Sequence, residues 1–103
     1  MTFCLCLTTV HNKSEADKIT DTILEKRMAA CIQQIPITSR YWWEGCIGSS
    51  EEILLMIKTQ SDLWNPLSEL IKSVHAYNVP EIIKLSIEDG LPEYLKWIKT
   101  ETY

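Results

Sequence analysis

A run of three aromatic residues constrains this chain more than any other part of its sequence. The run is Tyr41, Trp42 and Trp43, in a chain of 103 residues that contains four Trp, four Tyr and one Phe. Aromatic side chains favour extended backbone, so we predict a strand with Tyr41 and Trp43 on one face and Trp42 on the other. A short domain can hardly bury large rings on both faces. We therefore expect one face, or an edge, to contact a partner chain; the alternative is a core strand of a monomer.

Length and composition bound the class of protein. The length predicts a single domain over residues 1–103, and 46% hydrophobic with 23% charged residues is ordinary for a globular protein. The net charge is −4 and no Lys/Arg cluster is present, which argues against nucleic acid or an anionic membrane as partner. No apolar run is long enough to span a membrane, and the first ten residues lack the basic start and cleavage site of a signal peptide. We therefore expect a cytoplasmic protein.

The four cysteines, Cys4, Cys6, Cys31 and Cys46, allow two interpretations. They could form two disulfides in a secreted chain, but without a signal peptide we expect free thiols in a reducing compartment. Cys4 and Cys6 lie two positions apart and so share one face of a strand. Such a pair could bind a soft metal, but small buried core residues are the more common outcome.

The hydrophobic pattern predicts the order βαββαβ followed by a short helix. Predicted strands cover Thr2–Thr9, about 31 to 46, Glu51–Thr59 and Glu81–Ile87; predicted helices cover about 15 to 28, a segment ending near Val74–His75, and a short terminal segment starting at Pro92. This order is that of the split βαβ, or ferredoxin-like, α+β fold.

Local signals predict where these elements begin and end. Ser14 followed by Asp17 resembles a capping box for the first helix. For the second helix we predict an N-cap at Ser61 or Asp62, or at Asn65 just before a proline. The sequence does not decide between these starting points.

The turn and the last strand give two further expectations. Gly45, Gly48, Ser49 and Ser50 form the turn signal that joins the second and third strands into a hairpin. In the last strand the alternation points one set of side chains inward, Ile83, Leu85 and Ile87, and the other set outward, Lys84, Ser86 and Glu88.

Several motifs, in order along the chain, resemble those of the CutA divalent-cation tolerance family. The matching segments are Leu7–Thr9, Met28–Cys31, Ser39–Gly45, Ile57–Thr59 and Ser73–Ile82. The resemblance implies a ferredoxin-like protomer in a tight homotrimer, with an overall shape like the PII signalling proteins. Strands joined across subunits would cover sheet edges and the aromatic strand.

The same resemblance implies copper binding in some members, at a Cys that ends the first strand and a His-His pair after the second helix. This chain has Thr8 at the first position and Val74-His75 at the pair, so only His75 matches. Cys6 lies two residues before Thr8 on the same face. A single imidazole makes a poor metal site, because stable sites usually need three or four ligands. Three copies, or Glu81, would have to complete it.

One cluster of residues forms the candidate site. His75 and Glu81 are the candidate metal ligands, and the candidate ligand-binding residues are Arg40, Trp43, Glu44, Lys58 and Tyr77. In a cleft between subunits this set could hold a divalent metal such as copper, or a small anion. The structural alternative is that His75 interacts with the end of the second helix, that Tyr77 is an interface ring, and that Glu81 pairs with Lys58 or Arg40.

Three functions follow from these residues. The first is a cytoplasmic homotrimer that binds metal ions or a small ligand and acts in metal tolerance. The second is an enzyme, which we do not expect, because the cysteines lie in or beside apolar segments and no nucleophile or phosphate-loop motif is present. The third is a non-catalytic trimeric scaffold, or a PII-like signalling protein, with no metal site of its own.

Overall fold

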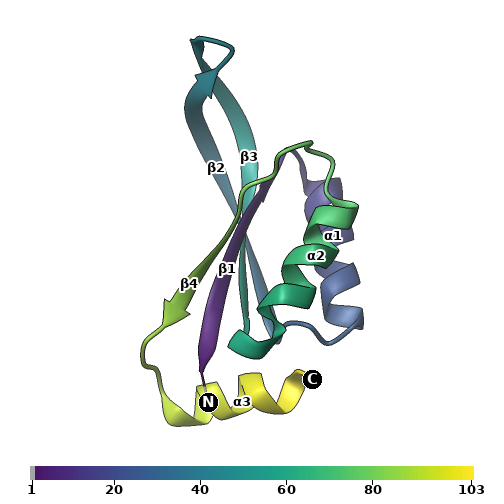
Figure 1. The fold of residues 1–103 in the computed structure, drawn as a ribbon, viewed down its shortest axis with the longest axis vertical. Coiled ribbons are helices and arrows are strands. Elements are labelled where there is room, and N and C mark those ends of the chain that lie inside the picture. Colours follow the sequence, from purple (N-terminus) through teal and green to yellow (C-terminus); the bar gives the residue numbers. More distant parts are fainter. Residues whose placement is uncertain (1) are drawn as a thin grey trace.

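A four-stranded antiparallel sheet forms one layer of the structure, and two helices form the other (Figure 1). This computed structural model describes residues 2–103. The elements are β1 Phe3–Val10, α1 Lys13–Glu25, β2 Cys31–Trp43, β3 Cys46–Gln60, α2 Trp64–Val74, β4 Ile82–Ile87 and α3 Pro92–Glu101, with a short 3-10 turn at Ser61–Leu63. The strand order is β2-β3-β1-β4. The predicted ferredoxin-like βαββαβ order with a terminal helix is confirmed.

The core lies between the helices and one face of the sheet. Along β1, buried and less buried side chains alternate. The buried ones that face the core are Cys4, Cys6 and Thr8, all of them fully buried. The residues that complete the core come from β3 and from the two helices: Leu55, Ile57, Ala16, Ile19, Ile23, Leu67 and Ile71. All four cysteines are free, as predicted, with Cys31 half-buried and Cys46 exposed.

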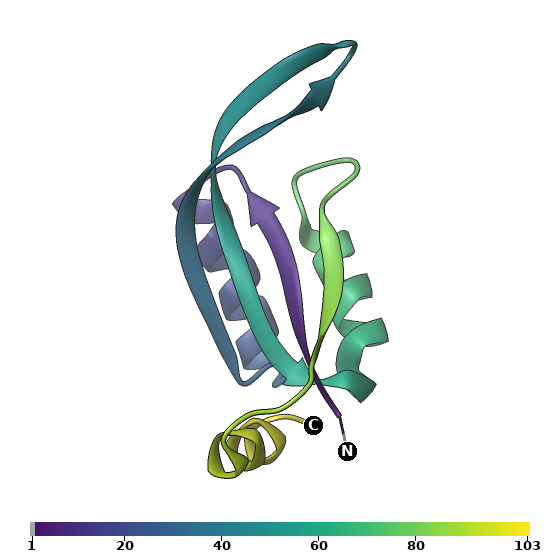
Figure 2. The same cartoon turned by 90° about the vertical axis from the view of Figure 1, so that its left-hand side faces the viewer.

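Helices α1 and α2 leave the opposite face of the sheet uncovered, and Figure 2 shows this face in front with both helices behind it. Leu85 and Ile83 of β4 lie on this face, opposite Leu5 and Leu7, and each is 46% exposed. Ile82 instead packs against the core. The predicted inward set in β4 was therefore wrong for Ile83 and Leu85. Shifting a strand by one residue moves every side chain to the other face of the sheet. In β4 the apolar residue that faces the core is Ile82 and not Ile83.

Strands β2 and β3 continue well past the end of β1 and form a two-stranded arm, residues 37–52, seen at the top of Figure 1. The arm carries the most exposed rings of the sheet: Trp42 is 74% and Trp43 66% exposed. The chain turns at Glu44 and Gly45, both with positive φ, 49° and 80°. Residues 48–50 belong to β3, so the predicted longer turn was wrong.

The helix starts also differ from prediction. Asn12 caps α1, because its side-chain oxygen accepts the backbone N–H of Glu15 at 2.8 Å; the predicted cap at Ser14 was wrong. Helix α2 has no side-chain cap, so neither predicted start was right. Pro66 is tolerated because it lies in the first turn, where backbone N–H groups have no partner within the helix. Pro92 begins α3 as predicted.

Helix α3 lies across the end of the sheet that is far from the arm (Figure 1). Ile98 is its buried residue, and Gln60 Nε2 donates to Thr102 Oγ1 at 2.7 Å just beyond it. No helix within residues 2–103 is long and apolar enough to cross a membrane.

Candidate functional site

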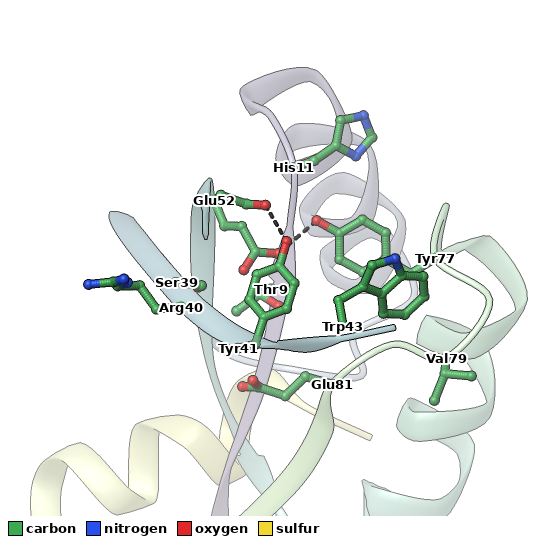
Figure 3. A pocket seen from close by; sticks show the side chains of 11 residues that line it. Thr9, His11, Ser39, Arg40, Tyr41, Trp43, Glu52, Tyr77, Val79 and Glu81 are labelled. Atoms are coloured by element: carbon green, nitrogen blue, oxygen red, sulfur yellow. Dashed lines mark hydrogen bonds between the residues drawn. The ribbon is translucent and has the colours of Figure 1, made fainter. Parts of the chain in front are cut away.

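A cavity of about 780 Å³ lies where the base of the arm, the end of β1 and the loop after α2 meet (Figure 3). Its lining combines aromatic, acidic and hydroxyl side chains: Thr9, His11, Ser39, Arg40, Tyr41, Trp43, Ser50, Glu52, Tyr77, Val79 and Glu81. The arm supplies the rings on one side, because β2 alternates and Tyr41 and Trp43 share a face.

Tyr77 is fixed in the cavity wall at both ends. Its hydroxyl donates to Glu52 Oε2 at 2.7 Å, and its backbone N–H donates to His75 Nδ1 at 3.1 Å. Burial and the Glu52 carboxylate together raise the pKa of Tyr77. Tyr77 therefore remains a neutral phenol and a hydrogen-bond donor near pH 7.

His75 links this loop to the sheet and uses both ring nitrogens to do so. Its Nε2 lies 2.8 Å from the Thr9 carbonyl oxygen, which can only accept, so Nε2 carries the proton. Its Nδ1 then accepts from the Tyr77 N–H. Burial lowers the pKa of His75 and so favours this neutral form. Neither nitrogen can bind a metal until one of these hydrogen bonds is broken.

Glu81 and Arg40 line the cavity differently. Both belong to the lining, but in Figure 3 the Arg40 side chain extends away from the other lining side chains. The ion pairs within residues 2–103 are Lys13–Asp17 and Arg27–Glu101. The pairing of Glu81 with Lys58 or Arg40 that we considered is therefore not formed in this chain.

Two predicted site residues lie elsewhere. Lys58 is paired in register with Leu5 and Cys31, and its Nζ lies 5.6 Å from the centre of the Tyr94 ring on α3. Glu44 is in the turn at the tip of the arm. A single chain thus places Trp43, Tyr77 and Glu81 around one cavity. Arg40 belongs to the same lining but extends away from it, and His75 is hydrogen-bonded to the Tyr77 backbone N–H.

Metal ligands do not gather anywhere in the described chain. Within residues 2–103 no group of three or more His, Cys, Asp or Glu side chains could hold a metal ion. Thr8, at the position of the family's cysteine, is buried on the core side of β1. One copy therefore supplies at most part of a metal site.

Several lining residues were missed from the sequence. Glu52 and His11 are not among the residues that the sequence predicts for the site. The Tyr77 hydroxyl nevertheless donates to Glu52, and the His11 and Tyr77 rings stack with their centres 6.0 Å apart. The alternation of Leu54 and Met56, extended back by one step, places Glu52 on the same face. The sequence therefore contained a signal for the face on which Glu52 lies. No sequence pattern shows that the loop 75–81 comes close enough for Tyr77 to bind Glu52.

The fold and site define an α+β domain of ferredoxin-like topology, with a projecting hairpin and an aromatic, acidic cavity at its base. A family model described as CutA1 divalent ion tolerance protein matches residues 4–101. The chain belongs to this family.

Similar proteins and solved structures carry the CutA name. Protein CutA of Mus musculus is 47% identical over 95 residues, which are 91% of this chain and 54% of that protein. The divalent-cation tolerance protein CutA of Pyrococcus horikoshii is 40% identical over 92% of this chain and 93% of its own length. The crystal structure of CutA1 from Oryza sativa superposes with a TM-score of 0.97 at 38% identity, over 100% of this chain and 95% of that one. The chain spans about half the length of the mouse relative.

Proposed function

We propose that this chain acts in divalent-cation tolerance as a cytoplasmic homotrimer, and that the clefts between its subunits bind a metal ion such as copper or a small ligand. The single observation that supports assembly most strongly is the arm, whose Trp42, Trp43 and Ile47 are 74%, 66% and 60% exposed. Isolated two-stranded hairpins are marginally stable in water, and exposed apolar strands commonly mark interfaces.

The open face of the sheet supports the same proposal. It presents Leu85 and Ile83 beside the half-buried Leu5 and Leu7, with no helix to cover them. Burying such side chains gains roughly 25 cal/mol per Å² of apolar surface. Neighbouring copies that used the arm and this face together would bury both.

Assembly would also bring more ligands to the cavity. One copy contributes Glu52 and Glu81 to the lining, and a third or fourth ligand would come from an adjacent copy. The loop carrying His75 borders the same cavity, but its imidazole would have to give up a hydrogen bond to bind a metal.

Two measurements test this function. Static light scattering should give three times the chain mass of 11.9 kDa, and a monomer in dilute buffer would refute the assembly. Calorimetric titration with copper and zinc should show saturable binding that is weakened in His75→Ala. A Glu88→Gln variant, which changes a carboxylate outside the cavity lining, serves as the control.

A second function is favoured by the full use of both His75 nitrogens. In that case the trimer is a scaffold, or a PII-like signalling protein, with no metal site of its own. Identical, negligible copper heats in the wild-type protein and in His75→Ala, from a protein that is still trimeric, would select this alternative.

We also propose that the protein is not an enzyme. Cys4 and Cys6 are fully buried, and burial raises the pKa of both thiols, that of Cys6 to about 12. A thiol of this kind is a poor nucleophile near pH 7. Thiol titration of the native protein should therefore leave Cys4 and Cys6 unmodified; rapid modification of either would contradict the proposal.

A further inference from the structure

We propose that the cavity at the base of the arm binds a small organic cation, and that an alkylated ammonium group lies among the rings of Tyr41, Trp43 and Tyr77. This inference rests on the proposed ligand-binding role of that cavity and names the chemical class of the ligand.

Three aromatic side chains from two segments of the chain border the cavity (Figure 3). Tyr41 and Trp43 come from the arm, and within one chain they remain 40% and 66% exposed, so their rings have surface for a ligand as well as for a neighbouring copy. Tyr77 comes from the loop after α2. A cation over an aromatic face gains about 0.5–1 kcal/mol at an exposed site and about 2 kcal/mol when water is excluded.

The charges around the cavity have the sign that a cation requires. Glu52 and Glu81 contribute carboxylates, and Glu52 is held in place by the Tyr77 hydroxyl, which uses one of its two oxygens. Arg40 is the one Lys or Arg among the lining residues, and it extends away from the cavity in Figure 3.

This composition favours an organic cation over a small anion or a bare metal ion. An anion would face two carboxylates and would find Arg40 turned away. A metal ion needs three or four donor atoms in close contact, and within residues 2–103 no such group is formed. An alkylammonium ion is large and weakly hydrated, and it needs ring faces and nearby negative charge rather than direct ligands.

Choline and 3,3-dimethylbutan-1-ol make a direct test. The two molecules have the same shape, but the alcohol carries a carbon atom in place of the charged nitrogen. Calorimetric titration of the wild-type protein should show saturable choline binding, at least about tenfold tighter than binding of the alcohol. Equal affinities, or no heat from either compound, would overturn the proposal.

Paired variants locate the binding site. Trp43→Leu should weaken choline binding about fivefold or more, whereas Trp42→Leu, on the opposite face of the same strand, should change it less than about twofold. Glu81→Gln should weaken it by a similar factor, and Glu88→Gln, which removes the same charge beyond β4, should not. Equal effects within both pairs would overturn the proposal.

Light scattering on each variant separates loss of binding from loss of assembly. If Trp43→Leu no longer assembles as the wild type does, the Glu81→Gln and Glu88→Gln pair decides, because neither substitution changes an arm ring. Copper titration is run independently. If the trimer binds copper but not choline, the organic-cation proposal is refuted and the proposed metal-binding function is not. If it binds choline but not copper, the organic-cation proposal is supported.

Discussion

Thr8 has the one buried side-chain oxygen, within residues 2–103, that lacks a hydrogen-bond partner. Its Oγ1 is fully buried on the core side of β1, where its neighbours in register are Leu55 and Ile82. A buried hydroxyl without a partner loses its hydrogen bonds to water and regains none, which costs about 1–3 kcal/mol. The position therefore carries a polar atom that the packing of the core does not use.

We predict that Thr8→Val leaves stability unchanged or raises it by about 1 kcal/mol, because valine keeps the shape and removes the unpaired hydroxyl. Urea unfolding, compared at equal protein concentration, measures the difference. Thr59→Val is the control, since Thr59 Oγ1 donates to the Met28 carbonyl at 2.6 Å and its loss should destabilise. Destabilisation by Thr8→Val as large as that by Thr59→Val would contradict the prediction.

His75 predicts a pH dependence of stability. Burial lowers its pKa below 6.5 in the folded chain, although the hydrogen bond to the Thr9 carbonyl and the carboxylates of Glu15 and Glu52 partly oppose this. The unfolded chain therefore takes up a proton first as the pH falls. The contribution of His75 to the free energy of unfolding is constant above pH 6.5 and decreases as the pH falls from there to the folded-state pKa.

Denaturant midpoints measured from about pH 8 to about pH 5 should show this decrease in the wild-type protein and less of it in His75→Gln. A slope that survives His75→Gln undiminished would show that another group is responsible.

The two contacts of His75 illustrate what sequence reasoning can reach at this scale. The Tyr77 N–H lies two residues away, and a bond at the end of a helix could be anticipated. The Thr9 carbonyl lies 66 residues away, and only the packing of α2 against the sheet brings it close. Hydrogen bonds between residues close in sequence could therefore be predicted, and those between residues far apart in sequence could not.

At the scale of elements, the turn of the arm shows a mismatch between residue and conformation. Glu44 and Gly45 both have positive φ, at 49° and 80°, in the two-residue loop between Trp43 and Cys46. Such turns strongly prefer Asn-Gly or Asp-Gly, because Asn tolerates the left-handed region better than Glu does.

We predict that Glu44→Asn rigidifies the arm. The expected gain is a few tenths of a kcal/mol to about 1 kcal/mol, visible as slower amide hydrogen exchange across residues 37–52. Glu51→Asn, within a strand of the same arm, should not slow exchange, since Asn is disfavoured in strands. Equal protection in both variants would argue against the turn as the source.

The order and type of the elements followed from hydrophobic spacing, but some of their ends and faces did not. The first helix was placed a few residues late because Ser14 resembled a cap, whereas Asn12 makes the bond. In β4 the run Ile82-Ile83 offers an apolar residue to either face, and only pairing with β1 decides between them. The spacing of apolar residues predicts the type and order of helices and strands well. Where two nearby residues could both cap a helix or both face the core, it predicts the helix start or the strand face poorly.

For the whole molecule, the open face of the sheet and the arm lead to one expectation about assembly. Leu85 lies on the open face, and Ser86 lies on the opposite face of the same edge strand. The molecule is elongated, with extents of 45 × 25 × 22 Å, because the arm projects beyond the sheet and helices. A shape of this kind favours contacts in which the arm of one copy lies along another.

We predict that Leu85→Glu releases single chains of 11.9 kDa, because a charge would be buried in the proposed interface. Ser86→Glu adds the same charge on the other face and should assemble as the wild type does. Light scattering at equal concentrations measures both. Wild-type assembly by Leu85→Glu would exclude this face of the sheet from the interface.

The exposed Cys46 has a practical consequence. It sits beside the turn at the tip of the arm, opposite Trp43, while Cys4 and Cys6 are sealed in the core and Cys31 is half-buried. A maleimide dye should therefore attach first at the tip, without any engineered residue. Energy transfer between dyes on separate copies would then report where each tip comes to rest.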